Sequence, residues 1–314
     1  MMLPSHYRLS ASAIKARGTE QGSALLAVFW GIIVLTMAVA GWFFWLQQRV
    51  QQHGQDSRSV EALAMAHSGI AVALNPKVDR YSSLLTAEIA PGMGYRVRIE
   101  SEGERLNLKM LLSDPTPARI SIFKHWLEWV IGVNPLEQDR LIDCLLDYVD
   151  ADNIPRANGQ EDTRDYHPAN RMLQNLDELK RIPGMEPLLA YPGWKELLTL
   201  DSIKLFDLTE APEDLLRILP GFNEAQIQRL IQMRAGPDGI LHTEDDPKYS
   251  GADLLLRQLG INNEKRRAEL ETLISVNETT LRIQAEGYSG KVIRQVQVVV
   301  RKGTGPPQIL SWIE

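Results

Sequence analysis

Residues 22–46, GSALLAVFWGIIVLTMAVAGWFFWL, decide the architecture of this chain. From residue 23 to residue 46 there is no charged side chain, and a helix of this length reaches roughly 36 Å, enough to span a bilayer with some tilt. A cleaved secretory signal has an apolar centre of only about 7–15 residues. This run is longer, and it ends in an aromatic belt at residues 42–45. We therefore expect a retained membrane anchor.

The charges around this run predict its orientation. Three basic residues, Arg8, Lys15 and Arg17, precede it, and only Glu20 opposes them. Because positive charge is retained on the cytoplasmic side, we expect a single pass with a short cytoplasmic N-terminus, and the rest of the chain across the membrane.

The helix is expected to continue beyond the membrane. Apolar residues recur at three- and four-residue spacing through residues 50–74, which is the pattern of an amphipathic helix. Gly54 and Gly69 interrupt this pattern. The apolar stripe predicts that this part of the helix packs on a globular domain, which a plain linker helix would not do.

Strand patterns occur near both ends of the remaining sequence. Alternation at residues 95–99, followed by a Glu-Gly-Glu turn and residues 105–108, predicts a β-hairpin. Residues 281–285, 291–301 and 308–313 predict three further strands, separated by glycine-rich turns.

The long section between these strand regions, about residues 111–275, has helical patterns broken by proline and glycine. The predicted fold class is therefore α+β, with a long N-terminal helix on a small antiparallel sheet and a large helical domain inserted in the sheet. The expected segments are 1–22 as a leader, 23–46 as the transmembrane helix, 47–110 as the rest of the helix and the first strands, 111–275 as the inserted helical domain, and 276–314 as the C-terminal strands.

Composition narrows the function. The chain has 314 residues and a net charge of −6, which argues against a general nucleic-acid binder. Its single cysteine, Cys144, excludes an internal disulfide and lies among leucines, so we expect a buried core residue.

A short internal repeat suggests hairpins of paired helices. Residues 177–185 and 213–222 both run from an acidic helix start to an apolar-Pro-Gly turn. Helix–hairpin–helix elements often bind DNA phosphates. Acidic residues at 210, 213, 214 and 224 would repel a phosphate, so the sequence favours a packing role for these hairpins.

Two acidic loops are candidate calcium sites. Residues 147–162 crowd carboxylates at a helix end and in an irregular loop, and negative charge at a helix C-terminus needs a compensating cation. Calcium, which takes six to eight oxygen ligands, is the natural candidate. The alternative is a solvated acidic loop. The expected ligands are Asp147, Asp150, Asp152, Glu161 and Asp162.

The second loop, residues 236–246, joins turn residues to closely spaced oxygen ligands. This loop is a weaker candidate than the first, and the alternative is a plain acidic turn without a metal ion. The expected ligands are Asp238, Thr243, Asp245 and Asp246.

The sequence contains no signature of catalysis. Its six histidines show no metal-binding spacing, and no nucleophile elbow, phosphate loop or dinucleotide fingerprint occurs. We do not expect an enzyme.

Four stretches resemble the protein K family of the type II (general) secretion pathway, the large minor pseudopilins. They are GSALLA at residues 22–27, EGERLNL at 102–108, LLDYVDAD and GQED at 145–152 and 159–162 with Tyr166, Asn170 and residues 177–184, and LSWIE at 310–314. The third stretch is the most specific.

This resemblance implies a pilin-like fold and an inserted domain with helix–hairpin–helix or sterile-alpha-motif-like repeats. It implies cleavage between Gly22 and Ser23 by the inner-membrane prepilin peptidase, methylation of the Ser23 amine, and calcium binding. The leader departs from the family because its basic residues lie further from the cut than usual. Cleavage after Gly18 would leave a polar start, so Gly22 is preferred.

The resemblance also implies a place in an assembly. The protein would sit at the pseudopilus tip with the minor pseudopilins I and J, initiating or capping assembly for export of folded proteins from the periplasm. Because of the negative net charge and the acidic hairpin, no nucleic-acid partner is expected. Shaft pseudopilins usually carry glutamate at the fifth mature position, where this chain has Ala27. That absence suits a subunit with no neighbour above it.

Two alternatives remain open at this point. A membrane-anchored, competence-type DNA-binding protein would use the helix–hairpin–helix element, and its soluble part would be retained on DNA in a salt-dependent way. A membrane-anchored peptidase or hydrolase is disfavoured because no nucleophile–base set is visible.

Overall fold

The structure, a computed structural model, describes residues 20–243, 245–303 and 305–314, and the side chains of these except at 20–24 and 48–56. Most of the predicted leader, residues 1–19, lies outside the described residues. The described chain falls into two compact units that divide between Arg58 and Ser59.

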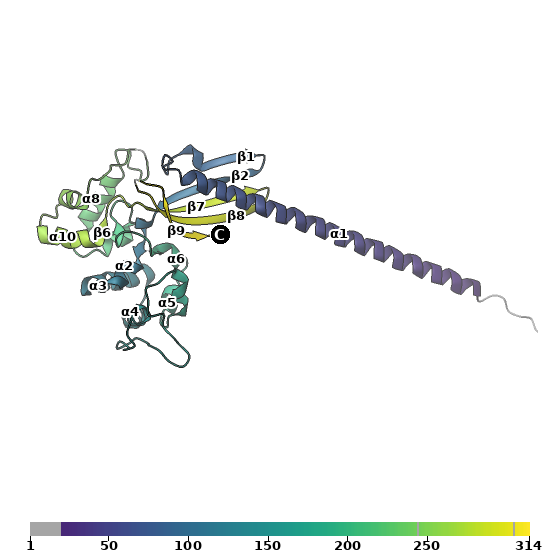
Figure 1. Cartoon of the computed structure of the whole chain (residues 1–314), viewed down its shortest axis with the longest axis horizontal. Helices are drawn as coiled ribbons and strands as arrows, with labels where there is room; N and C mark the ends of the chain where they lie inside the picture. Colours follow the sequence, from purple (N-terminus) through teal and green to yellow (C-terminus); the bar gives the residue numbers. More distant parts are fainter. Residues whose placement is uncertain (1–19, 244, 304) are drawn as a thin grey trace, which may run out of the picture. The chain divides into compact units, whose positions relative to one another are not determined.

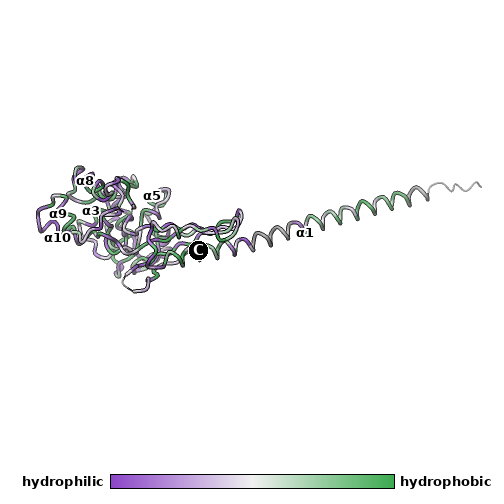
Figure 2. Tube along the Cα trace, turned by 90° about the horizontal axis from the view of Figure 1, so that it is seen from above, coloured by the Kyte–Doolittle hydropathy of each residue, from purple (hydrophilic) through white to green (hydrophobic). Residues whose placement is uncertain are grey.

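The first unit is the N-terminal part of helix α1 (Glu20–Ala73). Its segment Leu25–Gln47 has a mean hydropathy of 2.2 over 23 residues, which is long and apolar enough to cross a membrane. Figure 2 shows this stretch in green. Its large side chains are exposed, with Phe29 at 64% and Trp42 at 70%. The predicted apolar helix is therefore present, and its large apolar side chains are exposed.

The second unit contains a five-stranded antiparallel sheet. The strand order is β1-β2-β7-β8-β9, with β1 (Thr86–Ala90), β2 (Met93–Ser101), β7 (Thr280–Ser289), β8 (Val292–Arg301) and β9 (Gln308–Ile313). A 3₁₀ turn, η1 (Ser83–Leu85), leads into β1. The three strands predicted near the C-terminus are confirmed, and the turn between β7 and β8 is centred later than predicted, at Gly290.

The last turns of α1 pack on one face of this sheet (Figure 1). Ala66 and Ile70 contribute to a core with Ile283 and Val298, which are fully buried. Glycine makes the approach close, because a Cβ on Gly287 would lie 1.9 Å from the carbonyl oxygen of Ala62. The predicted amphipathic stripe is confirmed in part, because Ala66 and Ile70 cover the sheet whereas Val60 is 68% exposed.

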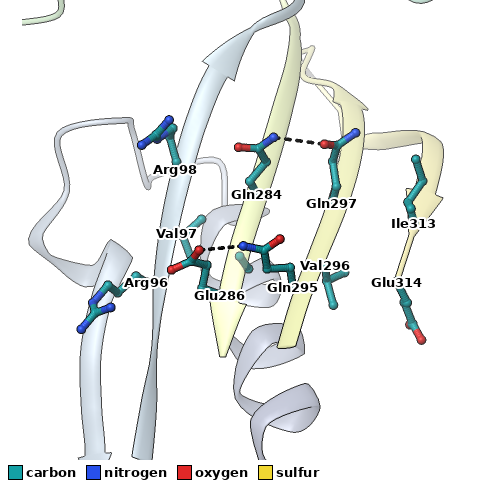
Figure 3. A pocket seen from close by; sticks show the side chains of 11 residues that line it. Arg96, Val97, Arg98, Gln284, Glu286, Gln295, Val296, Gln297, Ile313 and Glu314 are labelled. Atoms are coloured by element: carbon teal, nitrogen blue, oxygen red, sulfur yellow. Dashed lines mark hydrogen bonds between the residues drawn. The ribbon is translucent and has the colours of Figure 1, made fainter. Parts of the chain in front are cut away.

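The opposite sheet face is polar (Figure 3). Side chains alternate along each strand, so the residues between the buried ones point away from α1. Gln284 donates to Gln297 at 3.1 Å, and Gln295 donates to Glu286 at 2.8 Å. These side chains line a shallow pocket of about 610 Å³.

The predicted hairpin at residues 95–108 is wrong. After β2 the chain turns through η2 (Glu102–Glu104), whose capping box joins Ser101 and Glu104. The next strand, β3 (Leu106–Asn107), pairs in parallel with β4 (Leu198–Thr199) and not with β2. The partner of β2 is β7, far along the chain.

The α+β class with a helical insertion is confirmed, and the insertion occupies residues 102–279, between the adjacent strands β2 and β7. Its two ends meet where Ser101 pairs with Leu281. Directly beyond, buried Arg282 donates to both carboxylate oxygens of buried Glu102, at 2.6 and 3.3 Å. We call this pairing the neck.

The insertion has a core of its own, in which Phe123, Trp126 and Phe206 are the largest buried side chains. Its elements are α2 (Leu108–Ser113), α3 (Pro117–Trp126), the π-helical turn η3 (Leu127–Ile131), α4 (Pro135–Val149), η4 (Leu176–Arg181), α5 (Glu186–Leu189), α6 (Trp194–Leu197), α7 (Glu213–Arg217), α8 (Glu224–Arg234), α9 (Ala252–Gln258), α10 (Glu264–Leu273), and the parallel pair β5 (Phe206–Asp207) and β6 (Ile274–Ser275).

The turns of the two repeat copies share a backbone conformation, but the elements on either side of them differ. Gly184 and Gly221 both have φ of +81°, a left-handed conformation that glycine adopts without strain. The second turn joins the helices α7 and α8, whereas the first joins the 3₁₀ helix η4 to the four-residue helix α5. Only the second copy is a complete helix–hairpin–helix.

Candidate metal centre

The strongest candidate site begins at the end of α4. Asn134 caps the helix by accepting from the backbone N–H groups of Leu136 and Glu137, and Pro135 occupies its first turn. Asp147 lies in the last turn and is fully buried, and Asp150 follows directly after the helix. Both carboxylates sit where the helix dipole is negative, which is unfavourable without a nearby cation.

The loop after α4 adds a third carboxylate. Oxygens of Asp147, Asp150 and Glu161 all lie within 4.8 Å of one another. Gly159 allows the loop to come this near, because a Cβ there would lie 1.9 Å from Oδ2 of Asp147. The three carboxylates form what we call the acidic centre.

One cation, Arg156, enters the acidic centre. Its guanidinium lies 2.5 Å from both Asp147 Oδ1 and Asp150 Oδ2, and its backbone N–H donates to Asp147 at 3.2 Å. Although burial opposes it, the hydrogen bonds that the Arg156 guanidinium donates to these two carboxylates raise its pKa. One guanidinium against three carboxylates leaves the acidic centre with net negative charge.

Oxygen atoms remain without partners. Both oxygens of Glu161 and Oδ1 of Asp150 are buried and accept no hydrogen bond, and Glu161 as a whole is only 6% exposed. Burial, followed by the charges of Asp147 and Asp150, raises the pKa of the Glu161 carboxyl. Buried, unpartnered carboxylate oxygens at this density fit a hard divalent cation such as calcium.

Two of the expected ligands lie outside the acidic centre. Asp152 is exposed and accepts the backbone N–H of Ile154 at 2.8 Å. Asp162 is exposed and pairs with the imidazole of His167. The structure therefore brings together Asp147, Asp150 and Glu161 of the five residues expected from the sequence.

The second acidic loop is held by its own carboxylates. Asp245 accepts from the hydroxyl of Thr243 at 2.6 Å and from the backbone N–H of Asp238 at 3.2 Å. The Thr243 hydroxyl bond lowers the pKa of the Asp245 carboxyl. Asp246 accepts the backbone N–H of His242 at 2.7 Å. These bonds are those of a tight acidic turn, and the described part of the loop contributes only His242 to a cluster of ligand-type side chains.

That cluster was missed from the sequence. Ligand atoms of Glu104, Glu210 and His242 lie within 4.8 Å of one another. Arg80 already contacts two of them, donating to both oxygens of Glu210 at 3.0 and 3.1 Å and lying 2.6 Å from Nδ1 of His242. Its members come from distant segments, so no local spacing announces it.

Cys144 is buried, as expected. It is 1% exposed, and its thiol donates to the carbonyl oxygen of Asn158 at 3.6 Å. Burial raises the pKa of this thiol.

Comparisons with known proteins point to one family. A model of "Type II secretion system (T2SS), protein K" matches residues 104–191, which include the acidic centre. The type II secretion system protein K of Dickeya chrysanthemi is 32% identical over 83 residues, covering 26% of this chain and 23% of that protein. The alignment thus spans about a quarter of the relative's length.

A solved structure shares the fold. A chain in the crystal structure of the GspK-GspI-GspJ complex from the enterotoxigenic Escherichia coli type 2 secretion system matches with a TM-score of 0.59 and 17% identity, over 85% of this chain and 98% of that one. The fold and the match to residues 104–191 agree with the resemblance found in the sequence. Residues 104–191 are thus similar to the type II secretion system protein K family, and the fold of the chain is similar to that of a chain in the GspK-GspI-GspJ complex.

Proposed function

We propose that this chain is a minor pseudopilin that caps the tip of the type II secretion pseudopilus and helps to initiate its assembly. One observation carries the proposal. The pilin-like unit of α1 and five strands is interrupted, between β2 and β7, by an insertion that begins with the protein K match. A subunit that carries so large a second domain on its sheet is too bulky to be followed by further subunits in a shaft.

The proposed partners are the minor pseudopilins I and J, since the similar solved chain comes from a complex of GspK, GspI and GspJ. Co-expression of the full chain with I and J, extraction in mild detergent and size-exclusion chromatography tests this. We expect one peak that contains all three proteins. The major shaft pseudopilin in place of I and J is the matched control and should elute separately. Separate elution of this chain from I and J at every concentration would refute the proposed partnership.

The N-terminal half of α1 supports membrane anchoring. Leu25–Gln47 is long and apolar enough for one span, and the basic residues before it favour a cytoplasmic N-terminus and a periplasmic second unit. We propose the bacterial inner membrane as its location. Protease added to spheroplasts should remove the second unit, and full protection in intact spheroplasts would contradict this orientation.

Processing follows from the same proposal. Prepilin peptidase is expected to cut between Gly22 and Ser23 and to methylate Ser23. Mass spectrometry of the mature chain should find methylated Ser23. Gly22→Val should block the cut, whereas the matched variant Gly18→Val should leave it unchanged. An intact Met1 in the membrane-extracted protein contradicts this route.

We propose that the acidic centre holds a structural calcium ion through Asp147, Asp150 and Glu161. When bound, the ion supplies two positive charges where the chain supplies one. The carboxylates would then tie the end of α4 to the loop that carries Glu161. The loop at Asp238, Thr243, Asp245 and Asp246 is retained as a weaker second proposal, since its carboxylates already accept hydrogen bonds from backbone N–H groups and a hydroxyl.

No observation favours the DNA-binding alternative. At the complete helix–hairpin–helix, Arg217 is surrounded by three carboxylates, with Glu213 at 2.5 Å and Glu224 at 3.3 Å. Arg266 lies over the turn and donates to the carbonyl oxygen of Pro220 at 3.1 Å. Both guanidinium groups are engaged within the protein, so this hairpin is best described as a packing element.

A further inference from the structure

Five arginines of the described chain are buried, and one of them differs from the rest. Four have a carboxylate within ion-pair distance. These pairs are Arg105 with Glu100, Arg119 with Asp114 at 3.3 Å, Arg267 with Asp253 at 2.6 Å, and Arg282 with Glu102 at 2.6 Å. Arg234, at 5% exposure, has no carboxylate of the described residues within that distance. A buried guanidinium without a counter-charge is costly, so its surroundings need an explanation.

Arg234 lies at the end of α8 and is only partly satisfied. One of its terminal nitrogens donates to the carbonyl oxygens of Leu208 and Ala211, at 3.3 and 2.6 Å. Its Nε is buried and has no hydrogen-bond partner. Burial lowers the pKa of this guanidinium despite nearby acidic groups, which agrees with the lack of a paired anion.

A cavity of about 510 Å³ opens beside Arg234. Tyr249 also lines it, and the Tyr249 hydroxyl is buried without a hydrogen-bond partner. Lys248 adds an ammonium group to the same wall. Two independent buried donors without acceptors therefore line one cavity, whose volume falls in the range of small-ligand sites.

Three carboxylates of this cavity already accept hydrogen bonds from other groups. Glu210 accepts from Arg80, Asp246 accepts from the backbone of His242, and Glu278 accepts the backbone N–H groups of Ile203 and Thr280. None of them accepts a hydrogen bond from Arg234 Nε or from the Tyr249 hydroxyl, which stay without acceptors. A ligand that completes it must bring acceptor oxygens.

We propose that this cavity binds a carboxylate group, with the Arg234 Nε–H and the Tyr249 hydroxyl as its donors. A single negative charge is favoured over a phosphate dianion because the lining also includes Asp79, Glu210, Asp246 and Glu278. The carboxylate belongs either to a free organic acid or to an acidic residue of a polypeptide. This site is separate from the acidic centre and independent of the proposed role at a pseudopilus tip.

The test uses the full chain in detergent micelles with calcium present. Sodium acetate and a capped aspartate, N-acetyl-aspartate amide, are titrated against chloride at constant ionic strength while the melting temperature is followed. A carboxylate at a few times its Kd should raise Tm by about 2–4 °C, whereas phosphate should match chloride. Tighter binding of the capped aspartate than of acetate indicates a polypeptide source, and equal binding indicates a free acid.

Tyr249→Phe is the decisive variant, because it removes one donor without removing packing. Affinity for the carboxylate should fall about tenfold. Without carboxylate its Tm should be unchanged or higher, since the lost hydroxyl had no partner. Tyr288→Phe, on the polar sheet face, is the matched control and should bind normally.

A second measurement locates the ligand. In protein with ¹⁵N-labelled arginine, the Nε–Hε resonance that is lost in Arg234→Lys should shift during the acetate titration. Three results would each overturn the proposal. They are no response to either carboxylate, an equal response to phosphate, and an unchanged response in Tyr249→Phe.

Discussion

Replacing Glu161 by glutamine should change stability in opposite directions with and without calcium. In the calcium-free protein Glu161 is a buried carboxylate whose two oxygens have no donors, and Asp147 and Asp150 repel it. Glutamine has nearly the same shape and no charge. The same substitution removes a charged ligand from the proposed ion.

The magnitudes follow from these two roles. Glutamine removes the buried charge and replaces one unpartnered oxygen by an NH2 donor beside Asp147 and Asp150, a gain of about 1–3 kcal/mol, so calcium-free Glu161→Gln should melt roughly 2–10 °C higher than the parent protein. Calcium at a hundred times its Kd stabilises the parent by about 2.7 kcal/mol, a rise in Tm of roughly 5–10 °C. In the variant most of that rise should be lost.

The assay is a pair of melting curves, with chelator and with millimolar calcium, followed by calorimetric titration of calcium. Asp162→Asn is the matched control. It changes a carboxylate one residue away that is exposed and paired with His167, so it should leave both curves unchanged. If Glu161→Gln lowers Tm in chelator, the carboxylate has a partner and the proposed site is wrong. Identical curves in chelator and calcium for the parent protein would refute calcium binding altogether.

Three further predictions concern other parts of the chain. The pKa of the Glu161 carboxyl is raised from its ordinary value of 4.5, so the folded calcium-free protein binds this proton more tightly than the unfolded chain. The stability of the calcium-free protein should therefore fall as pH rises above about 4.5. Melting curves over a range of pH measure this slope, and calcium should flatten it. Gly287→Ala should destabilise the second unit by about 1–3 kcal/mol in urea unfolding, because the new methyl group meets the backbone of α1. Gly251→Ala, with open space around it, is the control. A zero effect at Gly287 would refute the close packing. Ala27→Glu places a carboxylate in the apolar segment at a cost of about 2.5–3.5 kcal/mol, and it should reduce membrane insertion or change assembly order. Full secretion with unaltered pseudopilus length would count against this prediction.

Local patterns predicted the elements of the fold better than their partners. The strands β7, β8 and β9 were visible because alternation and glycine-rich turns are local signals. The hairpin at residues 95–108 failed because Ser101 and Glu104 form a capping box, and the chain leaves the sheet there. The true partners of β2 and β3 lie far along the sequence, and periodicity carries no information about such pairing.

The acidic centre shows the same limit at the level of side chains. The place of Asp147 in a cluster of carboxylates could be predicted because it follows the apolar positions of α4 at the end of a helix. In the irregular loop beyond, neighbouring acids point in different directions, so that Glu161 is buried and Asp162 is exposed. Their sequence environments do not separate them. The close approach of Gly159 to Asp147 lets the loop return to the helix, and one glycine among many is a weak signal.

The neck makes the insertion a detachable module. Its two ends leave the sheet at directly paired positions, Ser101 and Leu281, so the strands β2 and β7 are already in register without it. A two-residue turn suffices to join antiparallel neighbours. A chain in which such a turn replaces residues 102–280 would keep the helix and all five strands. The ion pair between Glu102 and Arg282 would lose its acid in that chain, so Arg282 would need a neutral replacement. The unit of helix and sheet and the inserted domain are thus joined at a single pair of strand ends.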